Sequence, residues 1–209
     1  VVTGAGEKAF VAGADINEIR ALPSPQAGAE MARRGQRLFF KIERLPKPVV
    51  MAVNGFALGG GCELLLAGDI RLAADTARLG LPEINLGIFP GYGGTQRLSR
   101  LVGKGAATMM IFMGDMIDAQ EALRIGLVQK VLPAAELLGA AKALAKQLAQ
   151  KAPVALALAK RTIAEGLEVD LDRGCALEAA NFGIVCATED KEEGTAAFLE
   201  KRKPAFHGR

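Results

Sequence analysis

Histidine and cysteine are scarce in this sequence, and their scarcity argues against several kinds of catalytic or metal site. The only histidine, His207, lies near the end of the chain, so a cysteine–histidine pair would require that terminus to fold inward. The three cysteines, Cys62, Cys175 and Cys186, are odd in number and lack metal-type spacing. We therefore expect reduced thiols in a reducing compartment, with Cys62 packed in the core.

Long apolar runs and a strong charge bias are also absent. Runs such as 49–53 and 64–67 are far too short to span a bilayer, and the start of the chain has no signal-peptide pattern. The net charge of +3 comes from 26 basic and 23 acidic residues spread along the chain, which gives little support to nucleic-acid binding. With 209 residues, half of them hydrophobic, the chain is predicted to be a soluble globular protein with one sizeable core.

The order of strand and helix patterns predicts an α/β fold. A helical pattern at 26–45 is followed by a buried-type strand at 48–53, a short helix at 60–68 and a strand at 69–74. A further helix is expected to start at Thr95. After Val131 the pattern is wholly helical, at 134–151, 153–167, 171–187 and 190–203. We predict a core over residues 1–132 and a helical region over 133–209, whose broad apolar faces fit either an intramolecular bundle or subunit packing.

The most informative segment is residues 54–63, Asn-Gly-Phe-Ala-Leu-Gly-Gly-Gly-Cys-Glu. It predicts a glycine-lined turn between a strand and a helix, where backbone amides approach a ligand freely and Glu63 lies in the first helical turn. The segment fits neither the dinucleotide motif G-x-G-x-x-G nor a phosphate loop ending in Gly-Lys-Ser/Thr. Two interpretations stay open: an anion-stabilising site with an acid or base beside it, or an ordinary turn with a carboxylate favoured by the helix dipole.

Several motifs, taken together, resemble the enoyl-CoA hydratase (crotonase) family in order and spacing. They are residues 12–15, 54–63, 81–87 and 90–98, and residues 198–203 resemble the end of the same family. The resemblance covers the whole chain and implies a crotonase-type ββα spiral core with a C-terminal helical trimerisation region. It also implies a homotrimer or a dimer of trimers, a homohexamer. Since the chain starts with strand-like Val1-Val2-Thr3 and no methionine, we expect the N-terminal part of the core to be absent from it.

The same resemblance implies a reaction, the reversible addition of water to a 2-trans-enoyl-CoA in fatty-acid β-oxidation or related acyl-CoA metabolism. Negative charge would develop on the thioester oxygen, and the backbone amides of Ala14 and Gly60 would stabilise it as an oxyanion hole. Glu63 would activate the water, and Glu83 would deliver a proton to the α-carbon. Coenzyme A is part of the substrate, and no metal or redox cofactor is implied.

Contacts to coenzyme A are also implied by resemblance. The nucleotide would run past a loop formed by Ala12, Gly13, Ala14, Asp15 and Ile16. The amide of Gly91 would help to fix the water or Glu83. Phe198 and Lys201 match positions that reach the nucleotide of an adjacent subunit; the alternative is an exposed basic tail with one anchoring aromatic.

Two alternative functions stay open. One is an enoyl-CoA isomerase of the same fold, against which the presence of both glutamates counts. The other is an RNA-binding member of the family, although no lysine occurs between Lys8 and Lys41, the region corresponding to the lysine-bearing helix of that branch. We predict no nucleic-acid or membrane partner. The expected location is the bacterial cytoplasm, or the mitochondrial matrix if a transit peptide precedes Val1.

Overall fold

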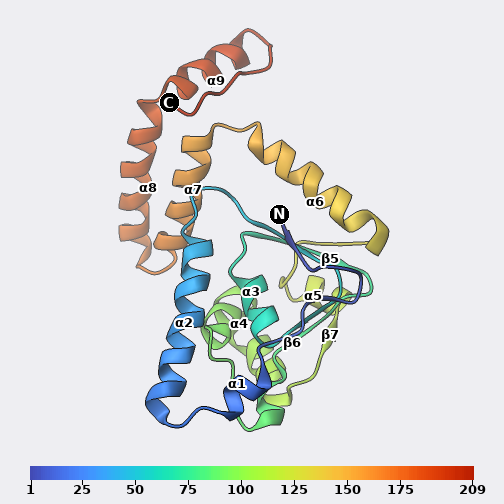
Figure 1. Cartoon of the computed structure of the whole chain (residues 1–209). Helices are drawn as coiled ribbons and strands as arrows, with labels where there is room; N and C mark the ends of the chain where they lie inside the picture. The colour runs from blue at the N-terminus through green and yellow to red at the C-terminus, as the bar shows by residue number, and fades with distance from the viewer. The chain divides into compact units, whose positions relative to one another are not determined.

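The computed structural model describes residues 1–209, which form two compact units (Figure 1). The first consists of Val1–Glu43 and Val49–Ala143, and the second of Arg44–Pro48 and Leu144–Arg209. The division therefore falls inside helix α6 (Ala134–Ala149), whereas the sequence-based boundary at 132/133 lies just before that helix. None of the helices has the length and apolar character that crossing a membrane requires.

Two four-stranded sheets form the core of the first unit. One contains β1 (Val2–Thr3), β3 (Val50–Val53), β5 (Ile70–Ala74) and β8 (Lys130–Leu132) in that order, all parallel. The other contains β2 (Ala9–Val11), β4 (Phe56–Leu58), β6 (Arg78–Gly80) and β7 (Ile117–Asp118), with only β6 and β7 antiparallel. Because strands β1 to β6 alternate between the sheets, the chain winds as a spiral of strand pairs, which confirms the predicted α/β core.

Helices follow the strand pairs. The first unit contains α1 (Ile16–Arg20), α2 (Pro25–Glu43), α3 (Gly60–Leu66), the 3-10 helix η1 (Pro82–Leu86), α4 (Gly94–Met113) and α5 (Ala119–Arg124). The predicted helices at 26–45 and 60–68 and strands at 48–53 and 69–74 are confirmed to within a few residues. Strands β2 and β4 were not predicted. Each has only three residues, too few to show alternation, and β4 lies inside the segment that we interpreted as a turn.

The centre of the first unit is apolar on both faces of β3. Val50 is 1% exposed, and Met51, Ala52 and Val53 are fully buried, as expected for a parallel strand covered on both sides. Helix α3 approaches the second sheet closely at Gly61, where an added Cβ would lie 1.9 Å from the carbonyl oxygen of Val11. Only glycine permits this approach, so Gly61 sets the position of α3 against β2.

The Asn54 side chain, directly after β3, fixes the beginning of the chain. Its Oδ1 accepts hydrogen bonds from Gly4 N at 2.9 Å and Thr3 Oγ1 at 3.3 Å. Its Nδ2 donates to the carbonyls of Gly6 at 2.9 Å and Ala9 at 3.2 Å. One amide side chain therefore joins the ends of β1 and β3 to the start of β2, the strand that leads to Ala14.

The second unit is helical, as predicted. It contains the end of α6, then α7 (Pro153–Gly166), α8 (Leu171–Cys186) and α9 (Glu189–Leu199). Helices α7 and α8 lie side by side (Figure 1). Between them, Asn181 Nδ2 donates to Thr162 Oγ1 at 2.8 Å, and an added Cβ at Gly174 would lie 3.3 Å from the carbonyl oxygen of Gly166.

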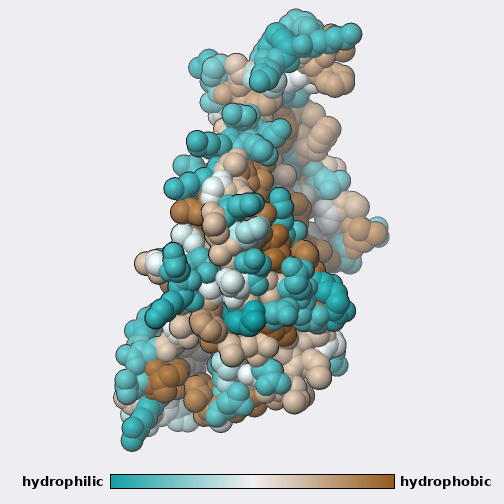
Figure 2. Space-filling view, turned by 90° about the vertical axis from the view of Figure 1, so that its right-hand side faces the viewer, coloured by the Kyte–Doolittle hydropathy of each residue, from teal (hydrophilic) through white to brown (hydrophobic).

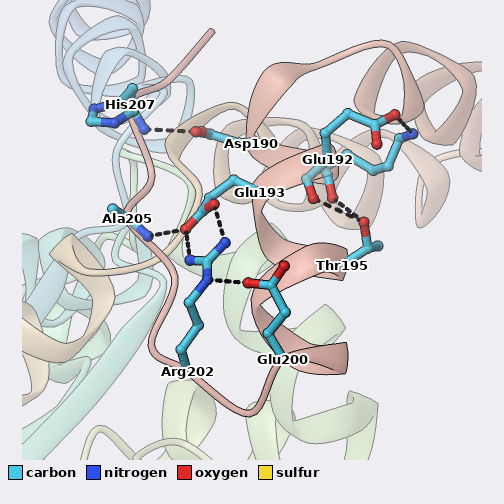
Figure 3. Close-up of polar contacts among 9 residues, drawn as sticks. Asp190, Glu192, Glu193, Thr195, Glu200, Arg202, Ala205 and His207 are labelled. Atoms are coloured by element: carbon cyan, nitrogen blue, oxygen red, sulfur yellow. Dashed lines mark hydrogen bonds and ion pairs between the residues drawn. The ribbon is translucent and has the colours of Figure 1, made fainter.

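Carboxylates of α9 hold the C-terminal tail (Figure 3). The buried Asp190 accepts hydrogen bonds from His207 N at 2.6 Å and Gly208 N at 2.9 Å. Glu193 binds the guanidinium of Arg202 at 2.6 and 2.9 Å and accepts from Ala205 N at 2.7 Å. The hydrogen bond from Arg202 is the main reason that the pKa of Glu193 is lowered to about 2. These contacts are structural and keep His207 within the second unit.

Candidate functional site

The junction between β4 and α3 carries the site. Gly59 precedes α3 with φ 53° and ψ −124°, a conformation that favours glycine. Its amide donates to the carbonyl of Gly80 at 2.9 Å, which ties the junction to β6. An added Cβ at Gly59 would lie 3.2 Å from Glu83 Oε1. Glycine at this position therefore satisfies the backbone and leaves room for a neighbouring carboxyl group.

An open groove of about 650 Å³ runs along this junction. Both predicted oxyanion-hole residues line it. An added Cβ at Gly60 would lie 3.7 Å from Ala14 N and 3.5 Å from the ring of Tyr92, so Ala14 and Gly60 are neighbours although they are far apart in sequence. The groove is mostly apolar and is also lined by three cations of α2, Arg34, Arg37 and Lys41.

Glu63 is almost completely buried, at 2% exposure, on the first turn of α3. Its Oε1 accepts hydrogen bonds from two backbone amides, Tyr92 N at 2.8 Å and Gly94 N at 2.7 Å. Burial raises the pKa of Glu63 to about 7, and the negative charge of Glu83 adds to this rise, while the two amides lower it. Glu63 can therefore exchange a proton near neutral pH.

Glu83 lies in η1, directly after Pro82, and is half-buried. Its Oε2 is buried and has no hydrogen-bond partner in the chain. Burial raises the pKa of this carboxyl group as well. A buried carboxyl oxygen without a partner is costly, and such atoms are typical of reacting groups. Glu63 and Glu83 thus form an electrostatically coupled pair beside the Gly59–Gly60 junction.

The role of the turn at 92–94 in supporting Glu63 was not predicted from the sequence. The motif around it is visible in the sequence, but only the backbone conformation shows which amides point at the carboxylate. Gly93 has φ 108°, which directs the amides on both sides of it to one oxygen. The Tyr92 ring packs edge-on against Phe39, with centroids 6.0 Å apart, and an added Cβ at Gly35 would lie 2.3 Å from Tyr92 Cδ1.

The loop predicted to bind coenzyme A lies between β2 and α1. Gly13 has φ 121°, and Asp15 accepts a hydrogen bond from Asn17 N at 2.8 Å, which caps α1. Gly91 contacts α2 through its carbonyl, which accepts from Gln36 Nε2 at 2.8 Å. The predicted roles of residues 12–16 in binding coenzyme A, and of the Gly91 amide in fixing the water or Glu83, stay predictions.

Cys62 packs in the core, as predicted. It is fully buried, and burial is the main cause that raises the pKa of its thiol to about 12. Phe198, 82% exposed, lies in the last turn of α9, and Lys201, with φ 56°, follows the end of that helix in the second unit. Their contact with a nucleotide stays a prediction. No group of three or more histidine, cysteine or carboxylate side chains is placed to hold a metal ion.

Comparison with known proteins identifies the family. The chain is 51% identical over 203 residues to the short-chain-enoyl-CoA hydratase of Clostridium acetobutylicum, covering 97% of this chain and 77% of that protein. It is 50% identical to the crotonyl-CoA hydratase of Syntrophomonas wolfei, covering 99% and 79%. The crystal structure of an enoyl-CoA hydratase from Bacillus anthracis superposes with a TM-score of 0.94 at 45% identity, covering 99% and 80%. Since residues 1–209 also match the family described as enoyl-CoA hydratase/isomerase, the chain belongs to that family.

Proposed function

We propose that this chain is an enoyl-CoA hydratase that adds water to short- or medium-chain 2-trans-enoyl-CoA thioesters. The observation that carries the proposal is the coupled pair of raised-pKa carboxyl groups, Glu63 and Glu83, beside a groove that Ala14 and Gly60 share. Hydration requires two proton transfers and a stabilised thioester oxygen, and this arrangement offers a group for each. Relatives that are about half identical bear the names short-chain and crotonyl-CoA hydratase, which supports the same substrate class.

The amides of Ala14 and Gly60 are proposed to bind the thioester oxygen. Attack of water at the β-carbon pushes electron density through the double bond onto that oxygen, so donors placed in advance stabilise the transition state. Gly60 is the first residue of α3, where the amide is free of helical bonding and the helix dipole is favourable. The small residues at positions 14 and 60 leave space for the thioester.

The two carboxyl groups are proposed to divide the proton transfers. Glu63 takes a proton from water as the oxygen bonds to the β-carbon, and Glu83 gives a proton to the α-carbon. Both backbone amides donate their hydrogen bonds to Oε1 of Glu63, which leaves Oε2 for the water. Two adjacent carboxyl groups do not ionise independently, so the pair is expected to share one proton at neutral pH.

An assay of the chain with crotonyl-CoA tests this proposal directly. We expect Glu63→Gln and Glu83→Gln each to lower kcat by roughly 10²–10⁴-fold, the usual contribution of a general acid or base. Glu136→Gln, which removes an exposed carboxylate from α6, is the control and should leave kcat unchanged. Wild-type turnover in either site variant would refute the two-carboxylate mechanism.

The isomerase alternative is disfavoured because both carboxyl groups are present and the two relatives above are named as hydratases. Product analysis separates the reactions, since an isomerase converts a 3-enoyl thioester into a 2-enoyl thioester without adding water. The RNA-binding alternative gains no support from α2, where Arg34 and Arg37 pair with Glu18 and Glu30 at 2.5 Å. A steeply salt-dependent affinity for RNA would revive it.

A homotrimer or dimer of trimers is part of the proposal. Large hydrophobic side chains of the second unit are strongly exposed, including Leu167 at 79%, Leu171 at 80% and Phe182 at 67%. On the face drawn in Figure 2, hydrophobic residues form several brown patches among teal hydrophilic ones. Exposed apolar area of this kind is typical of subunit interfaces. Light scattering coupled to size-exclusion chromatography would test the proposal, and a monomer at micromolar concentration would contradict it.

A further inference from the structure

Arg97, in the first turn of α4, is enclosed by aromatic and polar groups of the first unit. Its side chain is only 12% exposed. The guanidinium carbon lies 4.9 Å from the centroid of the Phe40 ring and 5.9 Å from that of Phe39. A planar cation over aromatic faces is stabilised electrostatically, so the guanidinium is held between α2 and α4.

Three N–H groups of Arg97 make short hydrogen bonds. Nε donates to Glu43 Oε1 at 2.6 Å, and Nη2 donates to Glu43 Oε2 at 2.9 Å. Nη1 donates to the carbonyl oxygen of Tyr92 at 2.8 Å. Glu43 is the last residue of α2, so its two hydrogen bonds anchor Arg97 to a rigid helix. The Nη1 group of Arg97 remains to bind the turn at 92–94.

Tyr92 connects this contact to Glu63. The Tyr92 carbonyl binds Arg97, and the Tyr92 amide donates to Glu63 Oε1 at 2.8 Å. Gly94, two residues later, donates to the same oxygen at 2.7 Å. The carbonyl of Gly93 between them accepts from Arg97 N at 2.8 Å, where α4 begins. Arg97 thus contacts the turn twice, through its side chain and its backbone.

We propose that Arg97 is a positioning residue for Glu63: it holds the turn at 92–94 so that both amides bind Oε1 and Oε2 faces the reacting water. This inference rests on the proposed function, in which Glu63 activates that water. Arg97 acts through Tyr92 and does not line the groove. Arginine suits this place better than lysine, because the planar fork binds Glu43 with two N–H groups and keeps a third for the carbonyl.

The surroundings of Glu63 give the inference a measurable consequence. The pKa of Glu63 is raised chiefly by burial and lowered by the amides of Gly94 and Tyr92 and by the charge of Arg97. Losing Arg97 removes this positive charge and frees the turn, so the pKa of Glu63 should rise further. Two charged groups act on Glu63, namely Glu83 of η1 and Arg97 of α4. Two further titratable groups face it, Tyr92 of the turn and Cys62 of α3, and the charge of Glu63 contributes to the rise of their pKa values.

The test compares the wild-type chain with Arg97→Lys and Arg97→Met in the hydration of crotonyl-CoA over a range of pH. We expect kcat to fall roughly tenfold to a hundredfold, as for other small misplacements of a reacting group, with a change in KM of less than about threefold. The acid limb of the kcat profile should move to higher pH, more in Arg97→Met than in Arg97→Lys. Arg124→Met, which removes an exposed guanidinium paired only with Glu121 of its own helix, is the matched control.

A second measurement separates this inference from the proposed function. The side-chain carboxyl carbon of Glu63, followed by ¹³C NMR during a pH titration, reports its pKa without any turnover. If wild-type protein lacks hydratase activity, the proposed function fails, while an upward shift in Arg97→Lys still supports the positioning contact. A folded Arg97 variant with unshifted Glu63 titration and wild-type kcat overturns the inference. If Arg97→Met does not fold, Arg97→Lys and Glu43→Gln are judged by the same criterion.

Discussion

The amide nitrogen of Gly94 lies 2.7 Å from Glu63 Oε1, and a Cβ added at Gly94 would lie 2.9 Å from the same oxygen. One residue therefore binds the carboxylate through its backbone and leaves room for it by lacking a side chain. This requirement is independent of backbone conformation, because Gly94 is the first residue of α4 and its φ is not positive. Through this contact, the position of the Glu63 carboxylate on α3 depends on where the backbone of α4 begins.

Gly94→Ala is expected to lower hydratase kcat by about a hundredfold, because the new methyl group must displace Glu63 from its amide donors. Gly105→Ala is the matched control. It lies in the second part of α4, after the non-helical Gly103, with open space around it, so the added methyl group should leave kcat unchanged and change the free energy of unfolding by less than about 0.5 kcal/mol. Steady-state kinetics with thermal melting of both variants checks the prediction, and equal kcat values would contradict it.

Glu63→Gln is expected to stabilise the chain at alkaline pH. The folded-state pKa of Glu63 is about 7 against an ordinary value of 4.5, so folding favours the protonated form. The free energy of unfolding therefore falls by up to about 3 kcal/mol as pH rises from about 4.5 to 7, and it stays at the lower value above that range. Glutamine carries no charge and escapes this loss. Thermal melting of wild type and variant should agree near pH 4.5 and diverge at pH 8.5, with Glu136→Gln showing no such divergence.

Glu83→Gln is expected to lower the pKa of Glu63. The charge of Glu83 is one of the causes that raise this pKa, and glutamine removes the charge while keeping the shape. A ¹³C NMR titration of the Glu63 carboxyl carbon checks the direction. The titration of the pair in wild type should extend over a wider pH range than that of the single remaining carboxyl. An unchanged midpoint in the variant would mean that the two groups titrate independently.

Asn54→Ala is expected to destabilise the first unit by about 2–4 kcal/mol, because several backbone groups near the start of the chain lose their partner. Asn17→Ala, on the exposed α1, is the control, with an expected effect within about 0.5 kcal/mol. Chemical unfolding of both variants tests the difference. Equal midpoints would show that water replaces the side chain of Asn54 without cost.

Long periodic elements were predictable from the sequence, and very short ones were not. The helices of the second unit and strands β3 and β5 show clear apolar patterns, and they occur where the patterns place them. Strands β2 and β4 are held by pairing with neighbours distant in sequence, and three residues carry no periodicity. The spiral of strand pairs followed from the family resemblance and could not have been derived from these patterns alone.

The residues of the site were predictable from the sequence, but the residues that hold them in position were not. Ala14, Gly60, Glu63 and Glu83 were chosen by motif, and the structure brings them to one junction. Arg97 stands in the same motif region without any local sign of its partners, because Glu43 is 54 positions away in the chain. Contacts between distant segments depend on packing, and one sequence does not encode them in a form that can be read locally.

Asn54 precedes Gly55, and an Asn-Gly dipeptide deamidates readily when the chain is unfolded. Glycine hardly hinders the attack of its own amide nitrogen on the asparagine side chain, which releases ammonia and forms a succinimide. Water then opens this ring and leaves an aspartate or isoaspartate. Here both atoms of the Asn54 amide are engaged by Gly4, Gly6 and Ala9, and Gly55 is buried. The folded protein therefore resists deamidation at Asn54. The rate of this deamidation in stored samples would report how often the first unit unfolds locally around Asn54.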